Sequence, residues 1–454
     1  MKEKIAVTQD RKYELDAAWI KSLRKFAETA DKNYSKSTSA PYLEIGTGSS
    51  VEKDAFTAGK EAAEKAIKQI KSKRELQLAL VFAASVYEAN YEDLLKGVRA
   101  ITKTAPLAGC TTMGEINDKS LHKSVVVAIF AAEKETFSAE TIAMPLEEQY
   151  QERNNFTREL QKLEVMAEFK KQMPDLGIVF FPGYEKENGM KVIAPTFLSE
   201  YANKFSTPFP IIGCLAGDDW AFNKTYQFFN AKALTDTVVF VAIKTKLAFG
   251  IRRVHGLKPV NTSQYKLRVK NGLVTEMAKI QDNKIYKYAP VLDLYIRETG
   301  ITLKTLQDSV PLFLRELIGQ NRTPTITRLN DGAHGYPTFI EGKAIRFDNA
   351  FNDGDMVQIT RTTPEEIVTT TRNSITEATK IGKIGKIAGV LLISCASLEA
   401  VLNTHKLNEI ERIKPAFMDI PLFGCYNAGE IGPMAVPQGS GTVVALVFGN
   451  ELRE

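Results

Sequence analysis

The sequence predicts a mixed α/β protein made of three copies of one unit, with a β-rich segment between the second and third copies. Apolar runs of about five to eight residues, rich in valine and isoleucine, alternate with helical periodicity, as expected for sheets covered by helices. Three of the strands end in the same Pro-x-x-Gly-Cys pattern, at Cys110, Cys214 and Cys425. A repeat of this size has to be recognised before any single motif is interpreted.

The predicted unit is a helix, a strand, a second helix, a short strand that ends in cysteine, a polar loop and a third strand. In the first copy these are a helix from Phe56, LALVFAAS, a helix from Tyr91, PLAGCTTMGEI and SVVVAIF. In the second copy they are residues 158–173, 176–183, 190–205, 210–219 and 237–243. In the third copy they are residues 364–381, 389–395, 407–417, 421–431 and 442–448.

The remaining segments complete the predicted organisation. Residues 1–41 combine an amphipathic helix with a polar linker. Between the second and third copies, residues 244–363 contain short alternating runs and Asn-Gly and Asp-Gly turns, which are typical of hairpins. We therefore expect one module over residues 42–300, with two units and hairpins, and another over residues 301–454, with a β segment and the third unit.

Composition limits the function classes. Lys and Arg exceed Asp and Glu by 59 to 54 over 454 residues, which is weak beside the basic stripes of nucleic-acid-binding proteins. No stretch has the length of apolar sequence that a membrane span needs, and the N-terminus lacks the apolar core of a secretory signal. We expect a cytoplasmic protein that binds neither nucleic acid nor membrane.

The loops after the three Gly-Cys strands are the strongest candidate site, because α/β sheets place ligands at the carboxyl ends of their strands. A glycine follows each cysteine after three or four residues and an acid follows after five. The alternative is a fold-forming turn in which cysteine is a small buried hydrophobe and the acid caps backbone amides. The candidate ligand-binding residues are Cys110, Gly114, Glu115, Cys214, Asp218, Asp219, Cys395, Cys425, Asn427, Gly429 and Glu430.

Enzyme chemistry has less support in the sequence. The four cysteines form no Cys-x-x-Cys pair, and the histidines show neither zinc-binding spacing nor proximity to the Gly-Cys loops. There is no phosphate-binding Walker loop and no dinucleotide fingerprint. We expect a protein that is not an enzyme, with a cysteine nucleophile at Cys425 or Cys214 as the remaining catalytic alternative.

The chain resembles the FIST family, whose members have linked N-terminal and C-terminal modules. PLAGCTTMGEI, PIIGCLAGDD, YQFFNAKALTDTVVFVAI and VHGLKPV resemble the first module, and LLISCAS and PLFGCYNAGEIGP resemble the second. The resemblance runs from about Tyr42 to the end of the sequence. It implies a sensory protein in signal transduction that binds a small ligand, for which amino acids have been proposed.

On this resemblance, Glu115, Asp219 and Glu430 would orient a polar group such as an ammonium, and backbone amides near Gly114 and Gly429 would face an anionic end. No kinase, cyclase or chemotaxis module is recognised in the sequence, so the signal is expected to pass to a separate output protein. The alternative implied by the resemblance is a haem-binding nitric-oxide sensor with His255 as the haem ligand. The expected cofactor is otherwise none.

Overall fold

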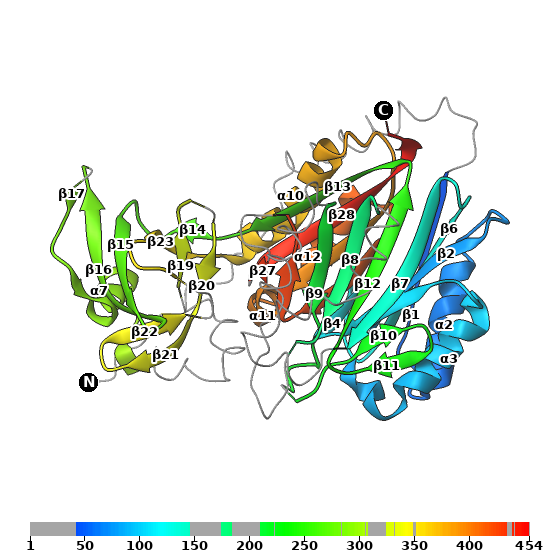
Figure 1. Cartoon of the computed structure of the whole chain (residues 1–454), viewed down its shortest axis with the longest axis horizontal. Helices are drawn as coiled ribbons and strands as arrows, with labels where there is room; N and C mark the ends of the chain where they lie inside the picture. The colour runs from blue at the N-terminus through cyan, green and yellow to red at the C-terminus, as the bar shows by residue number, and fades with distance from the viewer. Residues whose placement is uncertain are drawn as a thin grey trace.

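The computed structural model describes residues 42–145, 174–183, 209–221, 223–282, 284–304, 306, 324–330, 332–347, 351–433, 438–439 and 441–453. The predicted helix of residues 1–41 and the two predicted helices of the second unit lie outside the described residues. The described part has a large body and a smaller β-rich lobe beside it (Figure 1).

Three six-stranded sheets form the body, and all share one strand order. The first contains β1 (Leu43–Ser50), β6 (Val125–Ala132), β2 (Leu76–Ala83), β3 (Leu107–Thr111), β10 (Gln227–Phe229) and β11 (Lys232–Leu234). The second contains β7 (Phe137–Pro145), β12 (Thr237–Thr245), β8 (Leu176–Phe181), β9 (Ile211–Leu215), β26 (Gly429–Ile431) and β27 (Gln438–Gly439). The third contains β13 (Leu247–His255), β28 (Thr442–Leu452), β24 (Ile387–Cys395), β25 (Leu422–Asn427), β4 (Gly114–Asn117) and β5 (Ser120–Leu121).

The last two strands of each sheet come from a different unit of the chain. The pair β4–β5 follows the Gly-Cys strand of the first unit but joins the third sheet. The pair β10–β11 follows the Gly-Cys strand of the second unit and joins the first sheet. The pair β26–β27 follows the Gly-Cys strand of the third unit and joins the second sheet. We call these the exchanged strand pairs. In each sheet only the two central strands are parallel. The exchange is cyclic, so each Gly-Cys loop connects two sheets.

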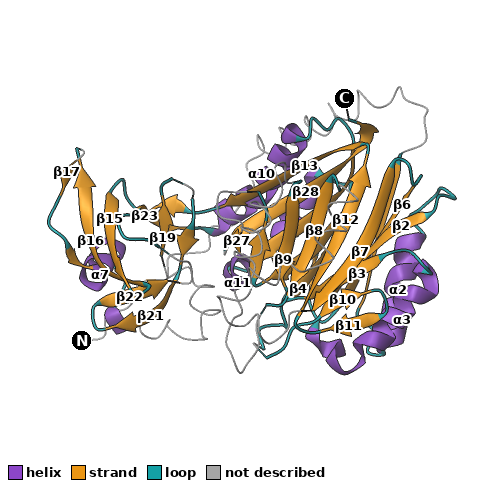
Figure 2. Ribbon diagram, viewed as in Figure 1, coloured by secondary structure: helices purple, strands orange, loops and turns teal. Residues whose placement is uncertain are grey.

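The described helices cover the outer faces of the first and third sheets (Figure 2). The predicted helices near Phe56 and Tyr91 are confirmed as α2 (Ala55–Ile67) and α3 (Tyr91–Thr102), and residues 364–381 form α10 (Pro364–Ile381). The predicted helix at residues 407–417 is shorter, as α12 (Glu409–Ile413) followed by the 3-10 turn η3 (Lys414–Ala416). A further helix that the sequence analysis missed, α11 (Ala396–Thr404), follows β24 directly.

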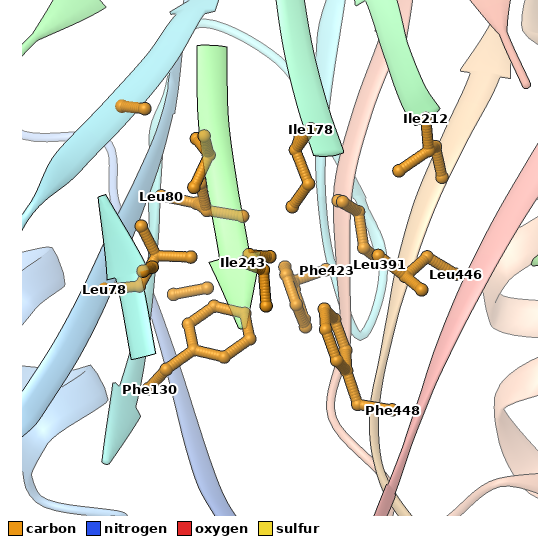
Figure 3. Close-up of a cluster of buried hydrophobic side chains, with 14 of the residues drawn as sticks. Leu78, Leu80, Phe130, Ile178, Ile212, Ile243, Leu391, Phe423, Leu446 and Phe448 are labelled. Atoms are coloured by element: carbon orange, nitrogen blue, oxygen red, sulfur yellow. The ribbon is translucent and has the colours of Figure 1, made fainter. Parts of the chain in front are cut away.

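The three sheets meet in one apolar core (Figure 3). Phe130 of the first sheet packs edge-to-face on Phe423 and Phe448 of the third, with ring centroids 5.8 and 5.3 Å apart. Ile178, Ile212 and Ile243 come from the second sheet. Aromatic pairs of this geometry add to the burial of their area, so this core holds the sheets in register with one another.

The smaller lobe is built on a ten-stranded sheet from the segment predicted to form hairpins. Its strands are β14 (Lys258–Pro259), β15 (Gln264–Lys270), β16 (Leu273–Gln281), β17 (Lys284–Ile285), β18 (Ala289–Pro290), β19 (Thr325–Arg328), β20 (His334–Gly335), β21 (Pro337–Glu341), β22 (Ala344–Phe347) and β23 (Met356–Arg361). Helix α7 (Val291–Thr299) packs its apolar side chains in this lobe. Because β15 pairs with β23, the sheet contains strands from both sides of the boundary predicted at residue 300.

The glycine of each Gly-Cys pair has a steric explanation. A Cβ on Gly109, Gly213 or Gly424 would lie 1.8–1.9 Å from a carbonyl oxygen of the neighbouring parallel strand. No side chain fits at that distance, so the backbones of the two central strands require glycine there. This part of the repeated motif is therefore explained by the packing of the sheet.

Candidate functional site

The three cysteines of the motif occupy equivalent positions near the ends of central strands. Cys110, Cys214 and Cys425 are fully buried in the central core, as free thiols. The Sγ atoms of Cys110 and Cys214 are 3.7 Å apart. Burial is the main cause that raises the pKa of Cys110 and Cys425 well above the usual value, and the Cys110 thiol is the main cause for Cys214. These cysteines behave as core side chains.

We therefore expect slow alkylation of the native protein by iodoacetamide at neutral pH. The reagent attacks thiolates, and burial both blocks access and disfavours the thiolate. The rate is measured by mass spectrometry of intact protein, with urea-unfolded protein as the control in which all four cysteines are exposed. Rapid modification of one cysteine in the native protein would contradict this interpretation and favour a nucleophile.

A polar side chain lies directly across from each core cysteine. In the antiparallel register, Glu115 of β4 pairs with Cys425, Glu430 of β26 with Cys214, and Gln227 of β10 with Cys110. We call Glu115, Gln227 and Glu430 the cross-strand polar residues. Residues paired in this way share one face of a sheet, so all three belong to the faces that carry the core cysteines. All three are completely buried.

The spacing of the sequence motif makes Asp219 the counterpart of Glu115 and Glu430, and the strand register corrects this. The second unit has a longer loop between its Gly-Cys strand and its exchanged strand, so the polar residue of that strand is Gln227. Only strand pairing identifies Gln227, because its spacing from Cys214 differs from that in the other two units.

Glu115 has partners for both carboxylate oxygens. Oε1 accepts from the Thr112 hydroxyl at 2.6 Å, and Oε2 accepts from the Ser124 hydroxyl at 2.5 Å and its backbone N–H at 3.3 Å. Burial raises the pKa of Glu115 to about 8, while the hydrogen bonds from Ser124 and Thr112 oppose the shift. Glu115 thus connects its own loop to Ser124, the residue before β6. This agrees with the alternative in which the acid of the motif stabilises a turn and does not bind a ligand.

Glu430 is only partly paired. Its Oε2 accepts from the Thr442 hydroxyl at 2.7 Å and backbone N–H at 3.2 Å, in the same manner as Glu115 with Ser124. Its Oε1 is buried and has no hydrogen-bond partner among the residues that the structure describes. Burial raises the pKa of Glu430 to about 8, although Thr442, the positive charge of Arg253 and the side chain of Cys395 oppose the shift.

Two further groups stand next to Glu430. The thiol of Cys395 is buried, and the neighbouring Glu430 carboxyl is one cause, after burial, that raises the pKa of Cys395 to about 12. Cys395 Sγ is also 3.0 Å from the Ser397 hydroxyl at the start of α11. Arg253 is buried on β13 and donates from Nη1 to the backbone carbonyl of Glu430 at 3.3 Å. Arg253 was not predicted from the sequence, although it continues the core-facing alternation of Leu247 and Ile251.

Three other predicted residues make hydrogen bonds that hold the loops in place. Asp219 accepts from the Ser85 backbone N–H and hydroxyl at 2.6 and 2.7 Å, which links the second unit to the first. Asp218 accepts from the backbone N–H groups of residues 223 and 224 at 2.7 and 3.1 Å, within its own loop. Asn427 accepts from the Gly429 N–H at 3.1 Å and also closes a local turn.

The loop of the first unit meets the third unit at Gly114. A Cβ there would lie 3.0 Å from the His122 ring and 3.1 Å from the Tyr426 ring, so the glycine makes room for both. His122 Nε2 lies 2.9 Å from Oε1 of the buried Glu399 on α11. This bond with Glu399 is the main cause that raises the pKa of His122. Neither residue was predicted from sequence, because they belong to different units.

His255, the predicted ligand of the haem alternative, lies half-buried at the end of β13. Its Nδ1 accepts from the Leu257 N–H at 3.3 Å, which leaves Nε2 as the nitrogen that a metal could reach. Its ring centroid is 5.5 Å from that of His334. Burial, Arg253 and Lys258 lower the pKa of His255. The imidazole fits an iron ligand, but His334, Arg253 and Lys258 beside it are polar or charged and do not form the apolar pocket that haem needs.

The fold and these buried polar positions define an α/β protein with cyclically exchanged sheets. Within the described ranges, His, Cys, Asp and Glu form no group of three or more that could hold a metal ion. None of the described helices has the length and apolar character of a membrane span. Residues 77–278 match the FIST N domain and residues 336–433 match the FIST C domain. The chain therefore belongs to the FIST family, whose domains are proposed to act in sensing and signalling. No curated protein matches the chain.

Proposed function

We propose that this protein is a non-catalytic sensory protein that binds a small polar ligand at Glu430. The observation that carries the proposal is the unpartnered Oε1 of a completely buried carboxyl group. A buried polar atom without a hydrogen bond costs about 1–3 kcal/mol, so such an atom requires a specific explanation. A ligand that donates a hydrogen bond to Oε1 removes this cost when it binds.

The surroundings of Glu430 support a ligand with a hydrogen-bond donor such as an ammonium group. Oε2 is held by Thr442, so the carboxyl is oriented with Oε1 as its open acceptor. Donation from a cationic group would also lower the pKa of Glu430 and favour its ionised form. An amino acid has such a group and remains the proposed ligand class.

The exchanged strand pairs offer a route from ligand to signal. Glu430 lies on β26, which hydrogen-bonds to β9 of the second sheet, while its Oε2 is bound to the first residue of β28 in the third sheet. A ligand that shifts Glu430 therefore acts on two sheets at once. In the proposal, a separate output protein in the cytoplasm binds the changed conformation and passes on the signal. The proposal also takes the three units as copies of one ancestral unit.

A thermal-shift screen against the standard amino acids and small primary amines tests the proposal. We expect at least one compound to raise the melting temperature of the wild-type protein, by an amount that grows with concentration as mass action requires. In Glu430→Gln the shift should fall strongly, because the amide presents a donor or a weaker acceptor in place of the carboxylate oxygen.

Glu115→Gln is the matched control, because Glu115 has the same register position but no open oxygen. Its ligand-induced shift should equal that of the wild type. The proposal is wrong if no compound stabilises the wild type, or if Glu430→Gln keeps the full shift. An absorption spectrum of protein expressed with haem supply separates the haem alternative, since bound haem gives an intense Soret band.

A further inference from the structure

Gln227 is the second cross-strand polar residue with open hydrogen-bonding groups. Its side chain is completely buried on β10, and neither its Nε2 nor its Oε1 has a hydrogen-bond partner within the part of the chain that the structure describes. An amide offers two N–H donors and one carbonyl acceptor. Leaving all of them unpaired in the interior is more costly than the single open oxygen of Glu430.

The two residues with open groups face neighbouring cysteines. Gln227 pairs across the strands with Cys110, and Glu430 pairs with Cys214. Cross-strand partners have Cβ atoms about 4.5–5.5 Å apart. The thiols of Cys110 and Cys214 are themselves 3.7 Å apart. Gln227 and Glu430 therefore each lie beside one thiol of a contact that joins the first and second sheets, and the Cys425 thiol interacts with both of these thiols.

Glu115 provides an internal comparison. It occupies the corresponding position opposite Cys425, but both of its oxygens are satisfied by Thr112 and Ser124. Burial alone therefore does not leave this position unpaired. Among the three cross-strand polar residues, open groups are found on Gln227 and Glu430 and not on Glu115 in the described structure, and this asymmetry points to a shared function for the two.

We propose that Gln227 is a ligand-binding residue that acts with Glu430, and that the ligand carries a carboxamide group. A carboxamide pairs with the Gln227 amide through two hydrogen bonds, one donated in each direction, and so satisfies both Nε2 and Oε1. A carboxylate has acceptors only and would leave Oε1 of Gln227 unpaired. A further N–H of the ligand is then donated to Oε1 of Glu430. This inference rests on the proposed function and names the ligand class.

The test compares Gln227→Met with the wild type, using paired probes that differ only in amide or acid: asparagine against aspartate, and propionamide against propionate. Methionine has a similar length and no strong hydrogen-bonding group. We expect the wild type to be stabilised more by each amide than by its acid. In Gln227→Met, affinity for the amides should fall at least about tenfold and the preference for amide over acid should disappear.

Stability without ligand gives an independent readout. Methionine removes the unpaired amide, so the ligand-free variant should melt at the temperature of the wild type or above it. A lower melting temperature would show that the amide already has a structural partner such as a bound water, and would overturn the inference. Equal stabilisation by amide and acid in the wild type would also overturn it.

The two proposals fail in distinguishable ways. If Glu430→Gln loses the ligand-induced shift and Gln227→Met keeps it, the ligand site at Glu430 stands and the role of Gln227 is wrong. If both variants keep the shift, both proposals are wrong. If Gln227→Met fails to fold, Gln227→Leu, which also lacks the amide, replaces it in the same comparison.

Discussion

Replacing Gly424 by alanine is expected to prevent the protein from folding. A Cβ at this position would lie 1.8 Å from the carbonyl oxygen of Leu392 in the neighbouring parallel strand, and φ is +145°. Both features exclude an L side chain unless the two central strands of the third sheet separate. That separation would break the hydrogen bonds between β24 and β25 and open the core. A loss of more than about 4 kcal/mol is expected, which exceeds most single substitutions.

The same change should be harmful at Gly109 and Gly213, where a Cβ would lie 1.8 Å from the carbonyl oxygen of Val81 and 1.9 Å from that of Val179. Gly385→Ala is the matched control, because a Cβ there would be no closer than 3.6 Å to the Glu451 side chain. Soluble yield and urea unfolding measure the effects. A Gly424→Ala variant as soluble and stable as Gly385→Ala would contradict the close approach of β24 and β25 at this position.

Glu115→Gln is expected to stabilise the protein at pH 8 and to flatten its pH dependence. The pKa of Glu115 rises on folding from 4.5 to about 8, so the folded state binds more protons than the unfolded state between these values. The contribution of Glu115 to stability is then greatest at or below pH 4.5 and falls as the pH rises towards 8. The contribution of this one group is at most on the order of 5 kcal/mol. Glutamine stays neutral and removes it.

The measurement is the free energy of unfolding in urea at several pH values from 5 to 8.5, for wild type and variant. The control is Glu64→Gln on α2, which removes a half-exposed carboxyl paired only with Lys60 at 3.8 Å. That variant should keep the slope of the wild type. If Glu115→Gln has the same slope as the wild type, or is less stable at pH 8, Glu115 is ionised in the folded protein at neutral pH.

The elements of the body were largely predictable because each has a strong local signal. The valine-rich runs at 125–132 and 442–452 form the predicted strands, and the capped segment Pro364–Ile381 forms its predicted helix to the residue. The helix α11 was missed because it follows β24 with no intervening turn residues. Local periodicity thus located most elements but not every boundary.

The pairing of the strands could not be predicted in this way. Nothing in the sequence near Glu115 indicates that β4 pairs with β25, more than 300 residues away, because partners in a sheet are chosen by tertiary packing. The same limit explains the site. Glu430 was found through its motif, whereas Gln227 became visible only through its register with Cys110. The repeated motif reflects two separate requirements. Its glycine is needed because the neighbouring parallel strand approaches closely, and its polar residue occupies a buried position.

The central claim is that Glu430 binds a ligand through its open oxygen. Isothermal titration calorimetry of wild type, Glu430→Gln and Glu115→Gln with the compound that stabilises the wild type most tests it directly. We expect one site per chain, binding at least about tenfold weaker in Glu430→Gln, which is about 1.4 kcal/mol, and unchanged binding in Glu115→Gln. Equal affinity in the wild type and Glu430→Gln would contradict it.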